Sequence, residues 1–576
     1  MALKVTFEVD KKYLFLSIFS TIISTAIPII SMLVMQSIIN KIQLGLSTFD
    51  IIIKNIVFYI ILDVILILQT NIFDIYQSKF TRNFHLKLET YLLEKCSLLD
   101  LHNFEDSKVY DMIQRSEDEG ISNTVNFIDN FIQLLRISIN LISYLFILLT
   151  FRVWLIIPVL IIPCVKYYVT RKYNIEEFNI IKNRTNESRK AWYLSYLLTR
   201  EDFFKEIKLN KLGNFFIEKY KTLYKKFISQ DMGLMKKYYL FLTIISIIEQ
   251  IIDGIIFVYI IYCGYIKIIL IGNVMTYTNS LMKVKENLQG MLSIVAKIKK
   301  ETLYIDLLYD FLNYPTNQRT GSVKIDSIET IEIKDLYFKY KNSDNYTLNN
   351  INLMFESNKM YTILGTNGSG KTTLIKLLMG FYPNYEGEII VNGIELKEID
   401  KDCYMSLIGT LFQDFSKYEA SYYDNIAYGN IEKIEDRKYV EDISEKFSID
   451  SILNKNSDKL DSQIGFWFDE GRQISMGQWQ KIATARAFAK KADLYILDEP
   501  NASLDVITER EIEDMYIKIF KDKIGLIIAH RFNNIIKKSS NIILINNGEV
   551  LSQGNHEDLL LNCELYKQLF FNNLEI

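Results

Sequence analysis

Proline, glycine and cysteine are scarce in this sequence. Its 576 residues include 6 prolines, 23 glycines and 5 cysteines. So few prolines and glycines exclude a loop-rich or low-complexity chain and favour long regular elements. The cysteines form no CxxC pair and lack metal-ligand spacing, so the fold does not rest on disulfides or a cysteine metal site. The formal net charge of −3 gives no reason to expect a nucleic-acid partner.

Hydrophobic residues, by contrast, make up 49% of the chain and are unevenly distributed. Long apolar stretches run from Tyr13 to Leu292, whereas short apolar runs alternate with polar segments from Ile331 onward. The chain is also too long for one compact domain. It therefore divides into a membrane part and a water-soluble part.

The first part predicts six membrane-spanning helices, each near the roughly 20 residues that cross a bilayer. A transmembrane domain is expected over 1–305, then a linker over 306–330 and a soluble domain over 331–576. Long, charged, apparently helical connections at 76–130 and 171–237 indicate that these loops and the N-terminus are cytoplasmic. The predicted spans are 13–39, 51–75, 131–150, 153–170, 238–263 and 274–295.

Two acidic residues interrupt the fifth span. Glu249 and Asp253 are four residues apart and therefore share one helix face. Charged groups at membrane depth are costly and face a bundle interior or a wet cavity. Two interpretations stay open: pairing with Lys283 or Lys285 between helices, or an acidic lining of a substrate cavity for a cationic cargo.

The second part contains a phosphate-binding loop, MYTILGTNGSGKTTLIKLL, between a predicted strand and a predicted helix. Its glycines let backbone N–H groups surround phosphates at a helix N-terminus. Lys371 places a charge on the β- and γ-phosphates, and Thr372 offers a hydroxyl to Mg²⁺. The predicted ATP-binding residues of the loop are Gly365, Thr366, Asn367, Gly368, Ser369, Gly370, Lys371, Thr372 and Thr373.

The segment LYILDEP supplies the acidic partners of such a loop. Asp498 ends an apolar strand and is placed to hold Mg²⁺. Glu499 is the candidate to orient or deprotonate the attacking water. ATP and Mg²⁺ are therefore the expected ligands.

Taken together, these motifs resemble an ABC exporter half-transporter: an all-α six-helix transmembrane domain followed by an α/β P-loop ATPase domain. The resemblance covers essentially the whole chain and implies a dimer that hydrolyses ATP to drive export. It assigns adenine stacking to Tyr340 in LYFKY, and Mg²⁺ contact and coupling to Gln413 in LFQDF. It assigns a catalytic γ-phosphate contact to His530 in IIAHRF. It also implies a signature that caps ATP of the opposite subunit, at Ser475, Gly477 and Gln478, and a D-loop with Ser503 and Asp505.

Within this family the chain is most similar to bacterial exporters of lantibiotics and other ribosomally made peptides. LFQDFSKYEASYYDNIAYG and QWQKIATARAF carry that similarity. Export of a cationic peptide across the bacterial cytoplasmic membrane is the expected function. A lipid or drug exporter and a non-transporting membrane ATPase remain alternatives. Because only about a dozen residues precede the first span, removal of a cargo leader is expected to fall to another protein.

One signature residue departs from the family pattern: Met476 stands where glycine is usual. Ser475 and Gly477 retain the hydroxyl and backbone donors, so a tolerated substitution in a homodimer is favoured. The alternative is one half of a heterodimer, in which this signature would cap a degenerate site of the partner.

Overall fold

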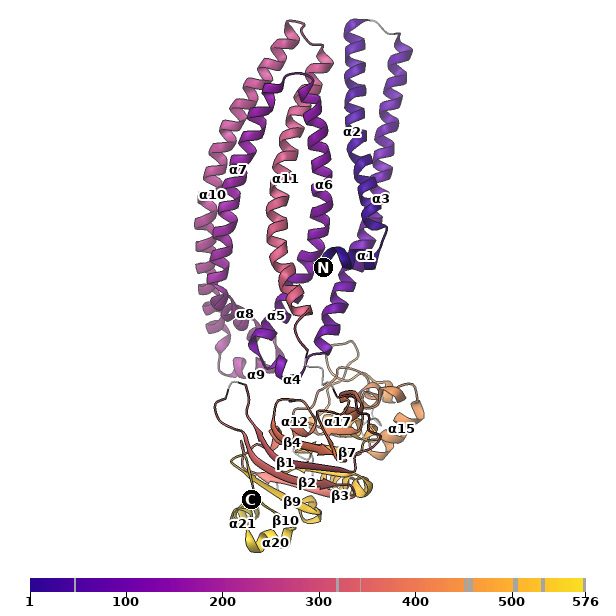
Figure 1. Ribbon diagram of the computed structural model, residues 1–576, viewed down its shortest axis with the longest axis vertical. Coiled ribbons are helices and arrows are strands. Elements are labelled where there is room, and N and C mark those ends of the chain that lie inside the picture. The colour runs from indigo at the N-terminus through magenta and orange to yellow at the C-terminus, as the bar shows by residue number, and fades with distance from the viewer. Residues whose placement is uncertain are drawn as a thin grey trace. The chain divides into compact units, whose positions relative to one another are not determined.

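The computed structural model describes the chain except residues 46–47, 317–320, 342, 450–452, 454–458, 501–505, 530–533 and 573–576. The chain divides into two compact units (Figure 1). The helical unit comprises Met1–Ser97 and Ser107–Pro315. The α/β unit comprises Leu98–Asp106 and Thr316–Ile576. The predicted domain boundaries stay a prediction, although helix continues to Leu312, through the first part of the expected linker.

Long helices make up the helical unit, as the scarcity of proline and glycine predicts. They extend beyond the apolar stretches into the charged connections, because the connections at 76–130 and 171–237 contain no proline and only three glycines. The helices are α1 (Ala2–Val9), α2 (Tyr13–Leu44), α3 (Phe49–Ser97), α5 (Ser107–Arg115), α6 (Ile121–Leu149), α7 (Ile156–Asn183), α8 (Thr185–Thr199), α9 (Glu201–Leu209), α10 (Leu212–Tyr265) and α11 (Ile271–Leu312). A π-helical turn (Ser116–Gly120) and a 3₁₀ turn (Val153–Leu155) complete the unit.

Five helical segments of the described chain are long and apolar enough to cross a membrane. They are Tyr13–Leu44, Phe49–Ser97, Ser107–Leu149, Val153–Ile181 and Leu212–Tyr265. The sixth expected span lies within α11, which is not among the five and carries Lys283, Lys285 and Glu286 in its middle. The chain is thus a multi-pass membrane protein, and the count of six spans stays a prediction.

The helical unit has its apolar core where α6, α10 and α11 meet. Leu148, Ile260 and Val284 are completely buried there, one from each helix. Figure 1 shows α6 and α11 running side by side along their length, and α7 and α10 likewise. Most other large side chains of α2, α3 and α10 are exposed, as expected for helix faces that contact lipid.

The α/β unit is built on two sheets. A six-stranded sheet has the order β10-β9-β3-β8-β7-β6, with all neighbours parallel except β10 and β9. A four-stranded antiparallel sheet has the order β2-β1-β4-β5. The strands are β1 (Thr330–Phe338), β2 (Leu348–Glu356), β3 (Lys359–Gly365), β4 (Glu386–Val391), β5 (Ile394–Glu395), β6 (Ile408–Leu411), β7 (Leu494–Asp498), β8 (Ile524–Ile528), β9 (Asn541–Asn546) and β10 (Glu549–Gly554).

The central strands β3, β7 and β8 are buried along nearly their whole length, which explains their continuous apolar sequences. Helices between the strands bury both faces. They are α12 (Lys371–Leu378), α13 (Lys401–Ser406), α14 (Tyr422–Ala427), α15 (Arg437–Lys446), α17 (Met476–Ala489), α18 (Val506–Ile519), α19 (Asn534–Lys538), α20 (His556–Asn562) and α21 (Glu564–Asn572), with 3₁₀ turns at Ile431–Lys433, Lys459–Asp461 and Phe520–Asp522. Because the parallel strands end at one edge, the residues that follow β3, β6 and β7 gather there.

A short stretch of the first long connection between predicted spans belongs to the α/β unit. Leu98–Asp106 contains the one-turn helix α4 (Leu101–Phe104). Glu105 accepts a bifurcated hydrogen bond from the Tyr382 hydroxyl, whose oxygen lies 2.8 and 2.9 Å from the two carboxylate oxygens. Asp100 pairs with Lys401, and Asp106 pairs with Lys341 at 2.9 Å. This nine-residue segment is therefore anchored by ion pairs and by a tyrosine of the ATPase domain.

Candidate nucleotide-binding site

The loop that follows β3 has the backbone that a phosphate site requires. Gly365, Gly368 and Gly370 all have positive φ, of 156°, 77° and 104°. A side chain at Gly370 would place its Cβ 2.7 Å from Leu348 Cδ2, so glycine is required for space as well as for conformation. Thr366–Gly368 form the exposed rim of this loop, and α12 begins directly after it.

The loop residues fit a phosphate group. Lys371 is 5% exposed, and its ammonium donates to the carbonyl oxygens of Gly365 and Thr366 at 3.0 Å each. Burial lowers the pKa of Lys371, against the opposing effect of the Asp498 and Glu499 carboxylates. The buried hydroxyl of Ser369 has no hydrogen-bond partner among the residues that the structure describes, as expected for a group that needs a ligand oxygen or a water. Thr372 is exposed at the start of α12, where its hydroxyl is accessible.

The two predicted acids lie at the end of β7, as the sequence indicates. Asp498 is 4% exposed, and its pKa is raised to about 6 by burial and by the charges of Glu499 and Asp414, with Lys371 opposing. A raised pKa means that too little positive charge surrounds the Asp498 carboxylate to stabilise its ionised form. A bound divalent cation would supply that charge. Glu499 is half-buried and has a φ of 49°, an uncommon conformation for a residue with a side chain.

Two further predicted residues lie on neighbouring elements. Gln413 follows β6 and is exposed. Tyr340 is half-buried, and its hydroxyl lies 3.0 Å from Thr373 Oγ1, which places its ring beside α12. The ring also packs edge-to-face with Tyr382, at 5.7 Å between centroids.

The signature residues form the start of α17. Ser475 is the N-cap: its hydroxyl accepts from the Gln478 N–H at 3.3 Å, and the Gln478 side chain accepts from the Ser475 N–H at 2.9 Å. This capping box leaves the first N–H groups of a 14-residue helix able to bind an anion. Met476 occupies the first helical position and is 43% exposed, so its side chain points away from the core.

Three predicted residues, Ser503, Asp505 and His530, lie outside the described residues. Their proposed contacts with nucleotide therefore stay predictions.

Sequence reasoning overlooked the polar side chains that hold these loops to one another. Gln480 on α17 donates to the carbonyl oxygen of Pro500, directly after the two acids. Arg486, further along α17, donates to the carbonyl oxygens of Ser416 and Asn425 at 2.9 Å each. Both residues stand in the quoted segment QWQKIATARAF, but their partners are distant in sequence, and no local pattern identifies them.

The described fold and site define a P-loop ATPase domain joined to a membrane domain of long helices. A family model for the ABC transporter matches residues 348–502. The chain is 35% identical to the subtilin transport ATP-binding protein SpaT of Bacillus subtilis, over 98% of this chain and 92% of that protein. It is 32% identical to the nisin transport ATP-binding protein NisT of Lactococcus lactis, over 99% of this chain and 95% of that protein.

A solved bacterial Atm1-family ABC exporter with ATP bound has the same fold, with a TM-score of 0.78 at 18% identity over 97% of each chain. The chain belongs to the ABC transporter family. It is a membrane ATPase that couples ATP hydrolysis to transport, with the exporter order of helical domain first and ATPase domain second.

The acids of the fifth expected span form a charge tetrad with two lysines: Lys166, Glu249, Asp253 and Lys285. Glu249 is 4% exposed, pairs with Lys166 on α7 and with Lys285 on α11 at 3.0 Å, and also accepts from Gln289 at 2.9 Å. Asp253 pairs with the same Lys285. The tetrad has no net charge and joins three helices.

This geometry favours the pairing interpretation over an acidic lining of a cavity. Of the two lysines expected as partners, Lys285 pairs with both acids. Lys283 instead pairs with Glu286 on its own helix at 2.9 Å, since the two residues are three positions apart and share one helical face. Lys166, which the sequence did not suggest, is the second partner.

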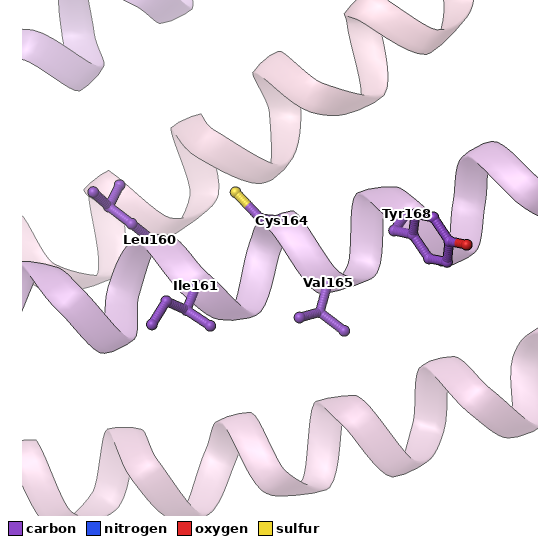
Figure 2. Close-up of a pocket in the computed structure, with 5 residues that line it drawn as sticks. All are labelled: Leu160, Ile161, Cys164, Val165 and Tyr168. Atoms are coloured by element: carbon purple, nitrogen blue, oxygen red, sulfur yellow. The ribbon is translucent and has the colours of Figure 1, made fainter.

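An apolar hollow of about 460 Å³ lies next to this cluster in sequence, on α7. Figure 2 shows that all five side chains that line it come from α7, with Ile161 and Val165 on one side of the helix. Tyr168 is 68% exposed. Because a single helix lines this hollow, it does not enclose a cargo. On a membrane-spanning helix such an apolar surface is suited to contact lipid or another helix.

Proposed function

We propose that this chain exports a ribosomally made, cationic peptide of the lantibiotic class across the cytoplasmic membrane, driven by ATP. The observation that carries the proposal is the identity of 35% and 32% to subtilin and nisin transport proteins along nearly the whole chain. The charge of Glu249 and Asp253 does not support a cationic cargo, because both acids are paired. The N-terminus and the ATPase domain lie in the cytoplasm, where ATP and the peptide are made.

The working unit is a homodimer with two composite ATP sites. In each site the loop Gly365–Thr373 holds the phosphates, with Lys371 as the fixed positive charge and Tyr340 against the adenine. Ser475 and the N–H of Gly477 from the second copy cap the γ-phosphate at the N-terminus of α17. Because these contacts form only in the closed dimer, ATP shifts the population toward closure, and hydrolysis reverses the shift.

The residues proposed to hold Mg²⁺ are Thr372, Gln413 and Asp498, and the bound ion would neutralise charge on the β- and γ-phosphates. The raised pKa of Asp498 supports this, since the carboxylate lacks a sufficient positive partner in the protein. Glu499 accepts a proton from the attacking water, and His530 contacts the γ-phosphate.

Accumulation of peptide in inverted membrane vesicles tests the function. The probe is a fluorescently labelled lanthionine peptide that still carries its leader. We expect accumulation that requires ATP and is abolished by Glu499→Gln, together with stimulation of ATPase activity by the peptide. The same accumulation assay with a fluorescent lipid and with a hydrophobic dye distinguishes a peptide exporter from a lipid or drug exporter. Lipid or dye transport without peptide transport would replace the peptide proposal, and peptide-independent ATPase activity without any transport would indicate a non-transporting ATPase.

A further inference from the structure

Two segments of the ATPase domain that are distant in sequence are joined by one short β-bridge, between Ser421 and Gln463. The first, Ser416–Asn425, follows Gln413 and is here called the post-glutamine segment. The second, Ser462–Ile474, ends at the signature and is called the pre-signature loop. The N–H of Ile464 donates to the carbonyl of Ala420 at 3.0 Å, and the N–H of Tyr422 donates to the carbonyl of Ser462 at 3.2 Å. The loop then turns back on itself, and the N–H of Gly465 donates to the backbone carbonyl of Arg472 at 2.9 Å.

One carboxylate fixes the turn of the pre-signature loop. Glu419 Oε2 accepts the backbone N–H groups of Phe466 and Trp467, at 2.9 and 3.5 Å. Glu419 is half-buried, whereas the side chains of Phe466 and Trp467 are exposed. A charged acceptor for two N–H groups makes stronger hydrogen bonds than a neutral one.

The glycine beside this cap leaves room for the carboxylate. Gly465 has a φ of 102°, and a Cβ on it would lie 1.4 Å from Glu419 Oε2. The φ disfavours any residue with a side chain, and a Cβ would push the carboxylate of Glu419 away from the loop. Glu419 and Gly465 therefore form one unit, in which the acid lies in the space that a side chain would fill.

The helix that carries the signature holds the same post-glutamine segment from its other side. Arg486 of α17 donates to the Ser416 carbonyl and to both the carbonyl and the side-chain oxygen of Asn425, the last at 2.6 Å. The post-glutamine segment thus contacts the chain both before and after Ser475.

We propose that Glu419 is a positioning residue that ties the Gln413 segment of one ATP site to the signature that caps the other site. This inference rests on the proposed homodimer with two composite sites. Glu419 contacts neither nucleotide nor metal in it. The residue orders the pre-signature loop, so that the signature reaches the partner's γ-phosphate only when the loop after Gln413 is in place.

Four variants of the full-length protein test the assignment. Glu419→Ala removes the cap, and Glu419→Gln keeps an oxygen acceptor of the same reach. Gly465→Ala displaces the carboxylate while keeping its charge. Asp469→Asn is the matched control, because it removes one negative charge from the exposed tip of the same loop. Each protein is examined by amide hydrogen exchange, by equilibrium binding of a fluorescent ATP analogue, and by ATPase activity against ATP concentration.

In Glu419→Ala we expect exchange of the amides of 465–474 to rise about tenfold, and kcat/KM for ATP to fall about tenfold, the scale of one lost charge-assisted hydrogen bond. The Kd of the ATP analogue stays within twofold, since the phosphate loop is not touched. We expect Gly465→Ala to change amide exchange and kcat/KM as Glu419→Ala does. In Glu419→Gln both quantities should lie within about threefold of wild type, and in Asp469→Asn they should equal those of wild type.

Three results would overturn the assignment: unchanged exchange in Glu419→Ala, unchanged kcat/KM despite raised exchange, or a parallel loss of analogue affinity. Hydrogen exchange reports on the loop even in a protein that transports nothing. Failure of the export proposal therefore shows as absent peptide accumulation in the wild type, and it is distinguished from failure of the Glu419 assignment.

Discussion

At the scale of single residues, the conformation of Glu499 is the feature that most directly indicates chemistry. Its φ of 49° places a glutamate in the left-handed region, at the end of the buried strand β7. Such backbone strain costs about 1–3 kcal/mol and persists where the surroundings enforce it, commonly at active sites. Its N–H donates to the carbonyl of Ile528 at 3.1 Å, which helps to hold this conformation.

We expect Glu499→Gln to bind ATP normally and to reduce ATP turnover by at least about a hundredfold, the scale of a lost general base. The amide keeps the size of the side chain but cannot accept a proton from water. Steady-state ATPase assays and nucleotide binding on the same preparation measure the two effects. Turnover within a few-fold of wild type would remove Glu499 from the catalytic role.

The pKa of Asp498 gives a second residue-scale prediction. Its ordinary value of 3.8 is raised to about 6 in the fold. The fold thus favours the protonated acid: this contribution to stability is complete below pH 3.8 and is lost as the pH rises through about 6. At neutral pH the ionised carboxylate destabilises the domain until a cation neutralises it.

Proton and Mg²⁺ should therefore compete for Asp498. We expect the Mg²⁺ concentration for half-maximal nucleotide binding to rise about tenfold for each pH unit below about 6, and to be nearly constant above pH 7. Titrations of a fluorescent ATP analogue with Mg²⁺ at several pH values measure this. Asp498→Asn should bind Mg²⁺ weakly at every pH, and a wild-type profile that is flat from pH 5 to 7 would contradict the assignment.

At the scale of elements, the segment Leu98–Asp106 is the point where the chain of the helical unit enters the ATPase domain. Tyr382→Phe removes the bifurcated hydrogen bond to Glu105 but keeps the ring in the core. We expect basal ATPase activity within about threefold of wild type and peptide-stimulated activity reduced about tenfold, because a loosened contact transmits cargo binding less well. Tyr385→Phe, another tyrosine of the same core cluster, is the control.

The charge tetrad is a second element-scale feature with a testable role. If it holds α7, α10 and α11 together, Glu249→Gln with Asp253→Asn leaves two half-buried lysines without a counter-charge. A fully buried pair would lose about 3–5 kcal/mol, and partial exposure of the lysines lowers that cost. We expect lower yield and melting temperature and reduced basal ATPase activity. Replacing Lys166 and Lys285 by methionine in the same protein should restore stability. A stable double variant that loses only peptide stimulation would instead assign the acids to the cargo.

These two elements also show what sequence could and could not predict. The phosphate loop and β7 were predictable, because glycine conformation, a buried strand and paired acids leave a local pattern in Gly365–Lys371 and Asp498. The pairing of Lys166 with Glu249, 83 residues apart, leaves no such pattern. The same holds for Tyr382 and Glu105, which are 277 residues apart. Contacts of this kind depend on how elements pack, so only the three-dimensional fold identifies them.

At the scale of the whole molecule, the question is whether one kind of chain suffices. Each chain has one phosphate loop and one signature in its sequence, so the proposed composite site needs two chains. Met476 is the one signature residue that departs from the family pattern. In the structure it occupies the first position of α17 with its side chain exposed, and the Ser475–Gln478 capping box is intact beside it. Nothing in this local geometry requires glycine at that position.

We therefore expect the purified chain, with no other half-transporter present, to hydrolyse ATP as a homodimer in lipid vesicles. Met476→Gly should leave the rate unchanged or raise it by less than about threefold, because the methionine provides no donor and glycine lowers helix propensity by only about 1 kcal/mol. ATPase activity and mass of the reconstituted protein measure both points. A well-folded chain that binds ATP as a dimer but does not turn it over would instead make this chain one half of a heterodimer. Its signature would then cap the partner's degenerate site, and activity would appear only when that partner is added.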